Sequence, residues 1–504
     1  MSELRSLMEQ ITALRQRLMQ LQAEAGKTDS TPSLTALLAE TVGSASPSSG
    51  ESVGPTQRTQ ALVDHAIGRL ADSLSAVEGS LPTALTSRVR ALLERGRQIV
   101  ALLRAMADSP ELSATYTTPA PGVAESSEDE LDPLAAAFRE TAAMTETCLR
   151  LVQAFPNSPT AQLRLADGLE CIIDLIEQRV AGLAHALRLR RVQTDRVGLL
   201  ATQLANLDQG RSVDVVALQA LAEQIWQDTL NDAPLRLLHT RPESADVDQP
   251  APARFIACRA LTVAQLVATL SRQDIQLQQI VADAILAALL HDVGLMRVPL
   301  SVLAASGPLD ANGRIALEAH PRTGAQLISE HLPSLARLAT PILCHHERPD
   351  GSGYPSGLRS SQLPLLARML AVADCYTDLV TPTPHRPGCD PRTALTDTLL
   401  LAERGQLDPN LAERLLGLSF YPVGSVVELS DGQIGQVVTA RVDKHDLNSP
   451  SRPVVSILMN ERGELVHTPV FIDLLNAHGL SIRRVLPAGH RRRFLGRRYP
   501  HLAV

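Results

Sequence analysis

Four histidines and two aspartates stand at wide intervals in a region that is otherwise mostly apolar. They come as a pair, a single residue, a second pair and a second single residue: His291-Asp292, His320, His345-His346 and Asp374. Any one of them alone is more typical of a polar residue satisfied within a protein core. Together, imidazole and carboxylate groups suit iron, manganese or zinc better than magnesium or calcium, and they exclude a thiolate site.

The adjacent pair His291-Asp292 favours a centre with more than one metal, because neighbouring ligands can serve two ions with the carboxylate as the bridge. Two metals about 3.5–4 Å apart can polarise a phosphodiester, and a bound metal lowers the pKa of water from 15.7 to about 7. The pattern therefore indicates metal-dependent hydrolysis of a phosphodiester.

Helices must bring these residues to one point. The stretch 280–290, IVADAILAALL, is apolar on nearly every side, which is typical of a buried helix. It ends at His291-Asp292 and so delivers both residues to the interior. His345-His346 end another helical stretch, ARLATPILCHHE, and Asp374 lies within ARMLAVADCYTDLV. We expect the helix ends to converge.

The order and spacing of these motifs resemble the HD-GYP subclass of the HD phosphohydrolases, over about residues 254–418. The matching segments are His291-Asp292-x-Gly294, His320-Pro321-x-x-Gly324, HHERPDGSGYPSGL at 345–358 and VAD at 372–374. The resemblance implies an all-helical fold and two divalent metals, iron or manganese, with zinc less expected. It also implies hydrolysis of cyclic di-GMP in bacterial second-messenger signalling.

The same resemblance assigns roles to single residues. Asp292 would be catalytic as well as a metal ligand. The loop that contains Gly353, Tyr354 and Pro355 would control substrate access and contact GGDEF-type partner proteins. Arg368 lies in the approach to Asp374 and would either face a substrate phosphate or form an ion pair within the fold.

Two positions depart from the family pattern. The helical stretch FIACRALTVAQLV places Arg259 where the family has an earlier histidine ligand, and a guanidinium cannot bind a metal. Leu295 stands where the family has a lysine that is thought to bind substrate phosphate or assist the reaction. The chain has only two lysines, Lys27 and Lys444, so an arginine would be the expected replacement.

Two hypotheses follow. The chain is a metal-dependent cyclic di-GMP phosphodiesterase, or it is a catalytically impaired HD-GYP-like scaffold that binds one metal or a nucleotide and signals through partners. Arg259 favours a single metal. A purely structural helical protein would leave the clustered histidines unexplained.

The fold class expected for the whole chain is mainly α, with a small C-terminal antiparallel β barrel or sheet. We expect these segments: a short coiled-coil-like helix (1–26), a linker (27–58), a helical segment (59–108), a second linker (109–133), a helical region (134–232), the HD-GYP-like domain (254–418), a β domain of four or five strands (421–487) and a basic tail (488–504). The leucine seam of the first helix favours a homodimer or, alternatively, a helix folded back on its own chain.

Composition sets outer limits. With 504 residues, 44% of them hydrophobic, the chain can form several cores, and its net charge of −7 makes nucleic acid an unlikely partner. Six scattered cysteines form no disulfide framework. The N-terminus has no signal-peptide core, and the longest strongly apolar run, 280–290, is too short to span a bilayer. These features predict a cytoplasmic protein without a membrane span.

Overall fold

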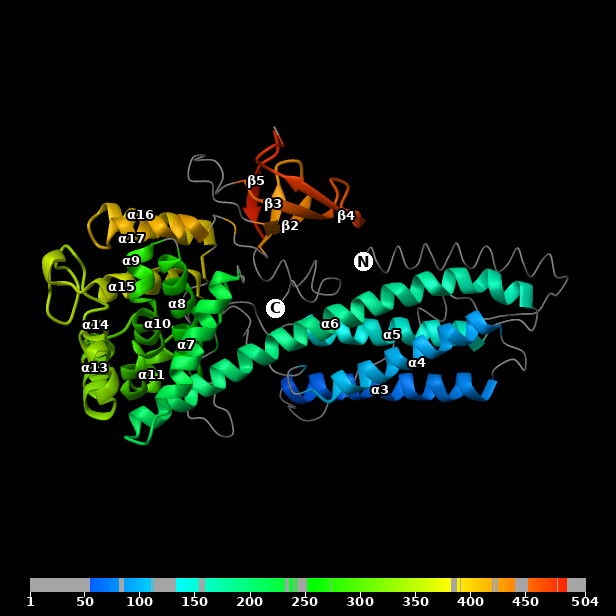
Figure 1. Cartoon of the computed structure of the whole chain (residues 1–504), viewed down its shortest axis with the longest axis horizontal. Coiled ribbons are helices and arrows are strands. Elements are labelled where there is room, and N and C mark those ends of the chain that lie inside the picture. Colours follow the sequence, from blue (N-terminus) through cyan, green and yellow to red (C-terminus); the bar gives the residue numbers. More distant parts are fainter. Residues whose placement is uncertain are drawn as a thin grey trace. The chain divides into compact units, whose positions relative to one another are not determined.

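The computed structural model is mainly helical, as predicted, with one small sheet near the C-terminus (Figure 1). It describes residues 55–80, 86–109, 112, 133–153, 159–231, 235–238, 240, 242, 252–272, 274–381, 388–389, 391–418, 421, 425–439, 452–477 and 479–486. The expected helix at 1–26 and the basic tail at 488–504 lie outside the described residues. The chain divides into two compact units, with the boundary at Arg191 and Val192 inside one long helix.

The first unit is built from long helices. They are α3 (Pro55–Ser80), α4 (Ser87–Ala107), α5 (Pro133–Gln153) and the first part of α6 (Pro159–Asp208). Helix α4 begins after Thr86, whose hydroxyl accepts a hydrogen bond from the backbone N–H of Val89, as a good N-cap does. Apolar positions at helical spacing, such as Leu70, Ile99 and Phe138, form one core.

The second unit begins with the end of α6 and contains the helices that carry the candidate ligands. Its helices are α7 (Val215–Leu230), α8 (Ala253–Ser271), α9 (Ile275–Gln279), α10 (Val281–Leu290), η2 (Val293–Arg297), α11 (Leu300–Leu303), α12 (Ala311–Glu318), α13 (His320–His331), η3 (Pro333–Leu338), α14 (Ala339–Leu343), η4 (Ser360–Gln362), α15 (Leu365–Val380), α16 (Pro391–Glu403), α17 (Pro409–Glu413) and η5 (Arg414–Leu418). Helices α8, α10 and α15 pack against one another in its centre.

Helix α8 is more apolar than the sequence analysis recognised. Among the described helices, it is the one whose length and composition would allow it to cross a membrane, and 72% of that window is buried inside the structure. Its side chains, from Ile256 to Leu270, belong to the same core as those of α10. The apolar surface of α8 is therefore accounted for by packing within the unit.

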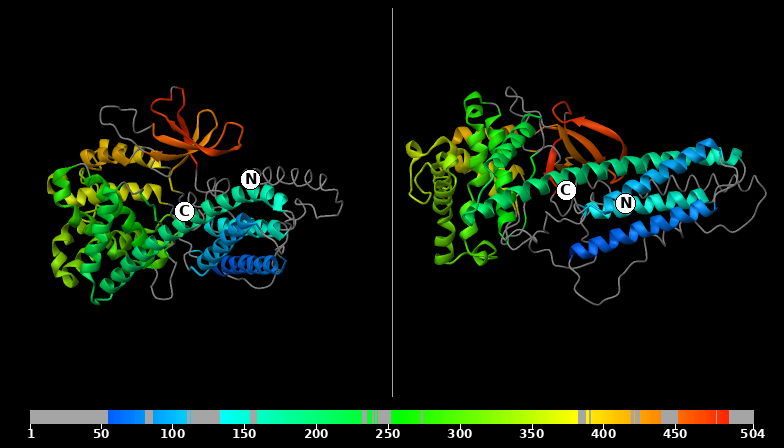
Figure 2. Two further views of the ribbon diagram at one scale, coloured as in Figure 1. Left: turned by 45° about the vertical axis from the view of Figure 1, so that its right-hand side comes forward. Right: turned by 60° about the horizontal axis from the view of Figure 1, so that its bottom comes forward.

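The C-terminal strands form an open five-stranded antiparallel sheet in the order β4-β3-β2-β1-β5, seen from two further sides in Figure 2. The strands are β1 (Val426–Leu429), β2 (Ile434–Thr439), β3 (Val454–Met459), β4 (Leu465–Asp473) and β5 (Ile482–Val485). The alternative of a closed barrel is wrong for the described residues, because β4 and β5 end the sheet without pairing with each other. Gly432 and Gly463 lie in turns between strands and have left-handed φ angles of 88° and 74°.

Candidate metal centre

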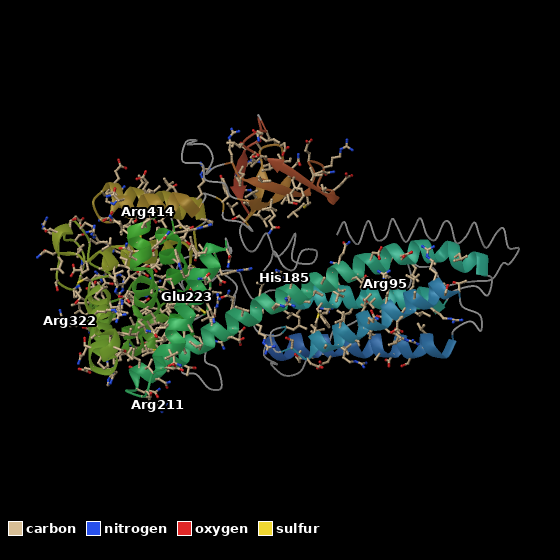
Figure 3. The ribbon with its side chains drawn as sticks, viewed as in Figure 1. Arg95, His185, Arg211, Glu223, Arg322 and Arg414 are labelled. Atoms are coloured by element: carbon tan, nitrogen blue, oxygen red, sulfur yellow. The ribbon has the colours of Figure 1, made fainter. Side chains whose placement is uncertain are left out.

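The six predicted ligands come together inside the second unit. His291 caps the C-terminus of α10 and Asp292 follows it, whereas His320 is the first residue of α13. His345 and His346 follow α14 after its C-cap residue Cys344, and Asp374 lies on the buried face of α15. Charged side chains such as Glu223 and Arg322 lie on the outside of the unit (Figure 3). Five of the six cluster residues, by contrast, are buried, and His346 is partly buried.

The cluster contains two sets of ligand atoms that share Asp292. The first set joins Asp292 with His320, His345 and His346. Asp292 Oδ1 lies 3.3 Å from Nε2 of His320 and 3.7 Å from Nε2 of His345. Those two nitrogens are 3.4 Å apart. Ligands bound at about 2.0–2.2 Å to one tetrahedral metal lie roughly 3.3–3.6 Å from one another. Asp292, His320 and His345 therefore lie close to the spacing of a single divalent metal site, and the ligand atom of His346 lies within 4.8 Å of theirs.

The second set joins His291, Asp292 and Asp374, and Arg259 lies against it. The distances from His291 Nε2 are 3.2 Å to Asp292 Oδ2 and 3.4 Å to Asp374 Oδ1. His291 Nε2 is buried and has no hydrogen-bond partner, which is the condition of an unfilled ligand. Taken alone, these three groups would also fit a metal.

Arg259, on α8, changes that conclusion for the second set. Its Nε donates to Asp292 Oδ2 at 2.8 Å, its Nη2 donates to Asp374 Oδ1 at 2.5 Å, and its Nη1 donates to Asp378. The guanidinium thus binds one oxygen of each carboxylate that a metal in this set would need. Two positive groups cannot share these oxygens without strong repulsion. The second set does not fit a metal while Arg259 is in place.

Three of the four histidines are fixed by the backbone. The Nδ1 atoms of His291, His320 and His345 each lie 2.6–2.8 Å from the carbonyl oxygen three residues earlier. When Nδ1 carries the proton and donates it to that oxygen, Nε2 is left as a lone-pair donor that faces the cluster. The local helical geometry therefore sets the tautomer that metal binding requires.

The charges of the cluster influence one another strongly. Burial opposes the ionisation of Asp292 and Asp374, but the positive charges of His291 and Arg259 respectively hold the pKa of both carboxyls well below the usual range. Burial opposes protonation of His291 as well, but the charges of Asp292 and Asp374 raise its pKa to about 10. Burial lowers the pKa of His345, and of His346 still further, so both imidazoles stay neutral. Neutral His345 and His346 beside the ionised Asp292 are the protonation states that metal binding in the first set needs.

The Gly-Tyr-Pro segment predicted to control substrate access lies directly on the cluster. The Tyr354 ring stacks on the His346 ring, with centroids 4.8 Å apart and planes at 24°. Gly353 approaches the backbone so closely that an added Cβ would lie 2.4 Å from the backbone N of Arg348. Only glycine fits there. The segment is therefore packed onto the residues that follow α14.

Comparison with protein families gives a decisive match over this unit. A family model for an HD domain matches residues 227–411, and a model for a KOW domain associated with HD domains matches residues 426–490. The first contains all six cluster residues and the Gly-Tyr-Pro segment. The chain contains an HD domain of the HD-GYP class.

Several curated relatives are similar to parts of this chain. A cyclic di-GMP phosphodiesterase of Pseudomonas aeruginosa is 30% identical over 267 residues, which are 53% of this chain and 61% of the relative. The cyclic di-GMP phosphodiesterase response regulator RpfG of Xanthomonas campestris is 40% identical over 133 residues, covering 26% and 35%. A 3'3'-cGAMP-specific phosphodiesterase of Vibrio cholerae is 32% identical over 130 residues, covering 25% and 24%. The chain thus spans less than two thirds of each of these relatives.

Among solved structures, an HDG"Y"P protein from Bdellovibrio bacteriovorus matches 49% of this chain and 78% of its own, with 17% identity and a TM-score of 0.34.

Leu295 and Arg368 lie elsewhere in the HD-GYP domain. Leu295 is buried in the core, 5% exposed, and so presents nothing to a substrate. Arg368 donates to Asp408 at 2.5 Å, so of its two expected roles the structure contains the ion pair. Arg297, two residues after Leu295, bonds to Asp208 at the end of α6.

Two residues of the site were missed by the sequence analysis. Asp378 lies one helical turn after Asp374 and accepts a hydrogen bond from Arg259; this i, i+4 spacing on α15 was a usable signal. Glu347 is 1% exposed and accepts from the backbone N–H groups of Ser356 and Leu358 at 2.7 and 2.9 Å. Glu347 lies within the matching segment HHERPDGSGYPSGL, but no role was assigned to it, because its partners are backbone groups in a loop.

Proposed function

We propose that this chain is a metal-dependent phosphodiesterase of the HD-GYP type that acts on cyclic dinucleotides, cyclic di-GMP first among them. The observation that carries the proposal is the grouping of Asp292 with the imidazoles of His320, His345 and His346, in which the distances from Asp292 to His320 and His345 are close to those around one metal. The relatives, which are named as phosphodiesterases for cyclic di-GMP and for 3'3'-cGAMP, support the substrate class.

We propose further that the centre holds one divalent metal, iron or manganese before zinc, rather than the two that the family pattern implies. Asp292, His320, His345 and His346 would hold it. Such a metal polarises a phosphoryl oxygen and lowers the pKa of bound water. Arg259 would supply a fixed positive charge in the second set.

The side chains around the proposed metal would have different roles. Asp292 would hold the metal through Oδ1 while its Oδ2 accepts from Arg259, so it couples the two sets. His291 and Asp374 would act around Arg259 as parts of the same charge network. The Gly353-Tyr354-Pro355 segment, half-buried beside His346, would border the substrate and present the exposed surface for GGDEF-type partners. We also propose a homodimer through residues 1–26 and a cytoplasmic location. We keep the domain boundaries predicted from the sequence as part of this proposal.

The test is turnover. The purified chain, loaded anaerobically with manganese or iron, is incubated with cyclic di-GMP and, separately, with 3'3'-cGAMP, and the products are separated by chromatography. The proposal predicts linear dinucleotide or mononucleotide, and loss of product in Asp292→Ala. The absence of product from both substrates, or turnover unchanged in Asp292→Ala, would refute it.

A second candidate, a binding scaffold without turnover, is favoured by Arg259 in the second set and by the buried Leu295. It predicts that cyclic di-GMP binds in calorimetry while no product forms. The double substitution Arg259→His, Leu295→Lys then separates the candidates. Activity that appears only in the double variant supports the scaffold, whereas activity in the parent chain excludes it.

A further inference from the structure

One of the four histidines lacks the backbone contact that orients the other three. His291, His320 and His345 each have Nδ1 within 2.8 Å of a carbonyl oxygen three residues earlier. Among the described residues, no such contact exists for His346, whose Nδ1 instead lies 4.0 Å from a carboxylate oxygen of Asp374. Its ring, 13% exposed, needs another source of order if it is to act as a ligand.

The Tyr354 ring supplies that order. It stacks on His346 nearly face to face, with a centroid separation of 4.8 Å, while the rings of His345 and His320 lie 4.2 and 5.0 Å away on other sides. The backbone N–H of Tyr354 also donates to the carbonyl oxygen of His346 at 3.3 Å. Aromatic contacts of this kind restrict ring rotation and exclude water.

Tyr354 is in turn held by Glu347. This carboxylate, 1% exposed, accepts one backbone N–H on each oxygen, from Ser356 and from Leu358. Ser356 follows Tyr354-Pro355 directly and Leu358 lies two residues further on, so the two bonds fix the backbone on the C-terminal side of Tyr354. A buried carboxylate that accepts two hydrogen bonds is costly to replace, because its partners are left without an acceptor.

We propose that Glu347 and Tyr354 are positioning residues for His346: Glu347 fixes the segment 353–358, Tyr354 fixes the plane of the His346 ring, and the pair thereby sets the metal affinity of the first set. The proposal rests on the metal centre proposed above. Positioning His346 differs from binding the metal, because neither the Glu347 nor the Tyr354 side chain belongs to the proposed ligand set. Partners that orient a metal ligand typically change affinity by about 10- to 100-fold when they are removed.

The test is a manganese titration, measured by calorimetry, of the full-length parent chain and of the variants Tyr354→Phe, Tyr354→Ala and Glu347→Gln. Tyr354→Phe keeps the stacked ring and is expected to bind as the parent does. Tyr354→Ala and Glu347→Gln are expected to bind about tenfold more weakly. Hydrogen exchange of residues 351–358, measured without metal, should rise in Glu347→Gln and not in Tyr354→Phe.

Asp408→Asn is the control, because Asp408 also lies in the HD-GYP domain, is 9% exposed and accepts from two backbone N–H groups, those of Asn410 and Leu411. It also forms the ion pair with Arg368, so this substitution removes more contacts than Glu347→Gln does. Asp408→Asn should leave manganese affinity unchanged. Equal losses in Asp408→Asn and Glu347→Gln, or parental affinity in Tyr354→Ala, would overturn the inference and leave the metal centre standing. A parent chain that binds no manganese would refute the metal centre and this inference together.

Discussion

The guanidinium of Arg259 lies where the carboxylates of Asp292 and Asp374 would otherwise face each other without a counter-charge. Both carboxylates are buried, and a buried charge without a partner is strongly unfavourable. With Asp378, three carboxylates share one arginine. At the scale of the residue, Arg259 therefore serves folding and limits metal binding at the same time.

Removal of this charge should destabilise the domain. Arg259→Met keeps much of the side-chain volume but leaves Asp292 and Asp374 with one positive group, His291, in place of two, so we expect a loss of about 3–5 kcal/mol in the free energy of unfolding without metal. Urea denaturation followed by Trp226 fluorescence measures it. Arg337→Met, which breaks the exposed pair with Asp283, should cost less than about 1 kcal/mol. Equal effects would contradict the account.

The same pair of aspartates predicts an acid dependence. Their pKa values are depressed in the folded chain, so they bind protons more readily when unfolded, where the pKa is about 3.9. Their contribution is complete above about pH 4 and is lost as the pH falls below that value. The free energy of unfolding should thus fall more steeply between pH 4 and pH 3 in the parent than in Arg259→Met. Parallel curves would count against the ion-pair network.

At the scale of the element, the site depends on how closely 3₁₀-helix η2 and helix α13 approach. A Cβ added at Gly294 would lie 2.0 Å from the carbonyl oxygen of His320. The glycine that follows the His-Asp pair is therefore required by packing, and it sets the separation of Asp292 from His320. The distance between the two proposed ligands Asp292 and His320 therefore depends on the backbone contact between η2 and α13.

Gly294→Ala should accordingly destabilise the domain by more than about 3 kcal/mol, since backbone on both sides must move. It should also weaken manganese binding, because His320 shifts with α13. Gly307→Ala is the control, as an added Cβ there meets nothing within 4 Å. Thermal unfolding and manganese titration of both variants check this. A stable Gly294→Ala variant with parental affinity would contradict it.

The sequence predicted the elements better than the contacts between them. An all-apolar helix that ends in His291-Asp292 was enough to place both residues in the interior. The resemblance to the HD-GYP family, together with the helical phase of α8, was needed to place Arg259 beside them. The hydrogen bonds from Ser356 and Leu358 to Glu347 could not be predicted, because every residue except proline has a backbone N–H group and the sequence does not show which of them are donors. Whether the β strands close into a barrel was equally open, since closure depends on pairing between strands far apart in the chain.

At the scale of the whole molecule, the two units have separate cores. The core around Phe138 belongs to the first unit and the core around the metal cluster to the second. Helix α6 contributes to both, with Leu183 in one and Leu204 in the other. Units with separate cores can unfold separately, and a single midpoint then does not describe the chain.

This arrangement predicts two unfolding transitions. The single tryptophan, Trp226, packs in the second unit, so its fluorescence reports that unit, whereas circular dichroism at 222 nm reports the helices of both. Phe138→Ala, at a fully buried site, should lower the stability of the first unit by about 3–5 kcal/mol and leave the Trp226 transition in place. A shift of the Trp226 transition by the same amount would show one cooperative unit.

The most direct test of the central claim is the metal content of the purified chain, measured by mass spectrometry after loading with manganese or iron and removal of free metal. The account predicts one metal per chain, held by Asp292, His320, His345 and His346, and a rise towards two in Arg259→His, where the guanidinium no longer occupies the second set. Two metals in the parent chain, or none, would contradict it.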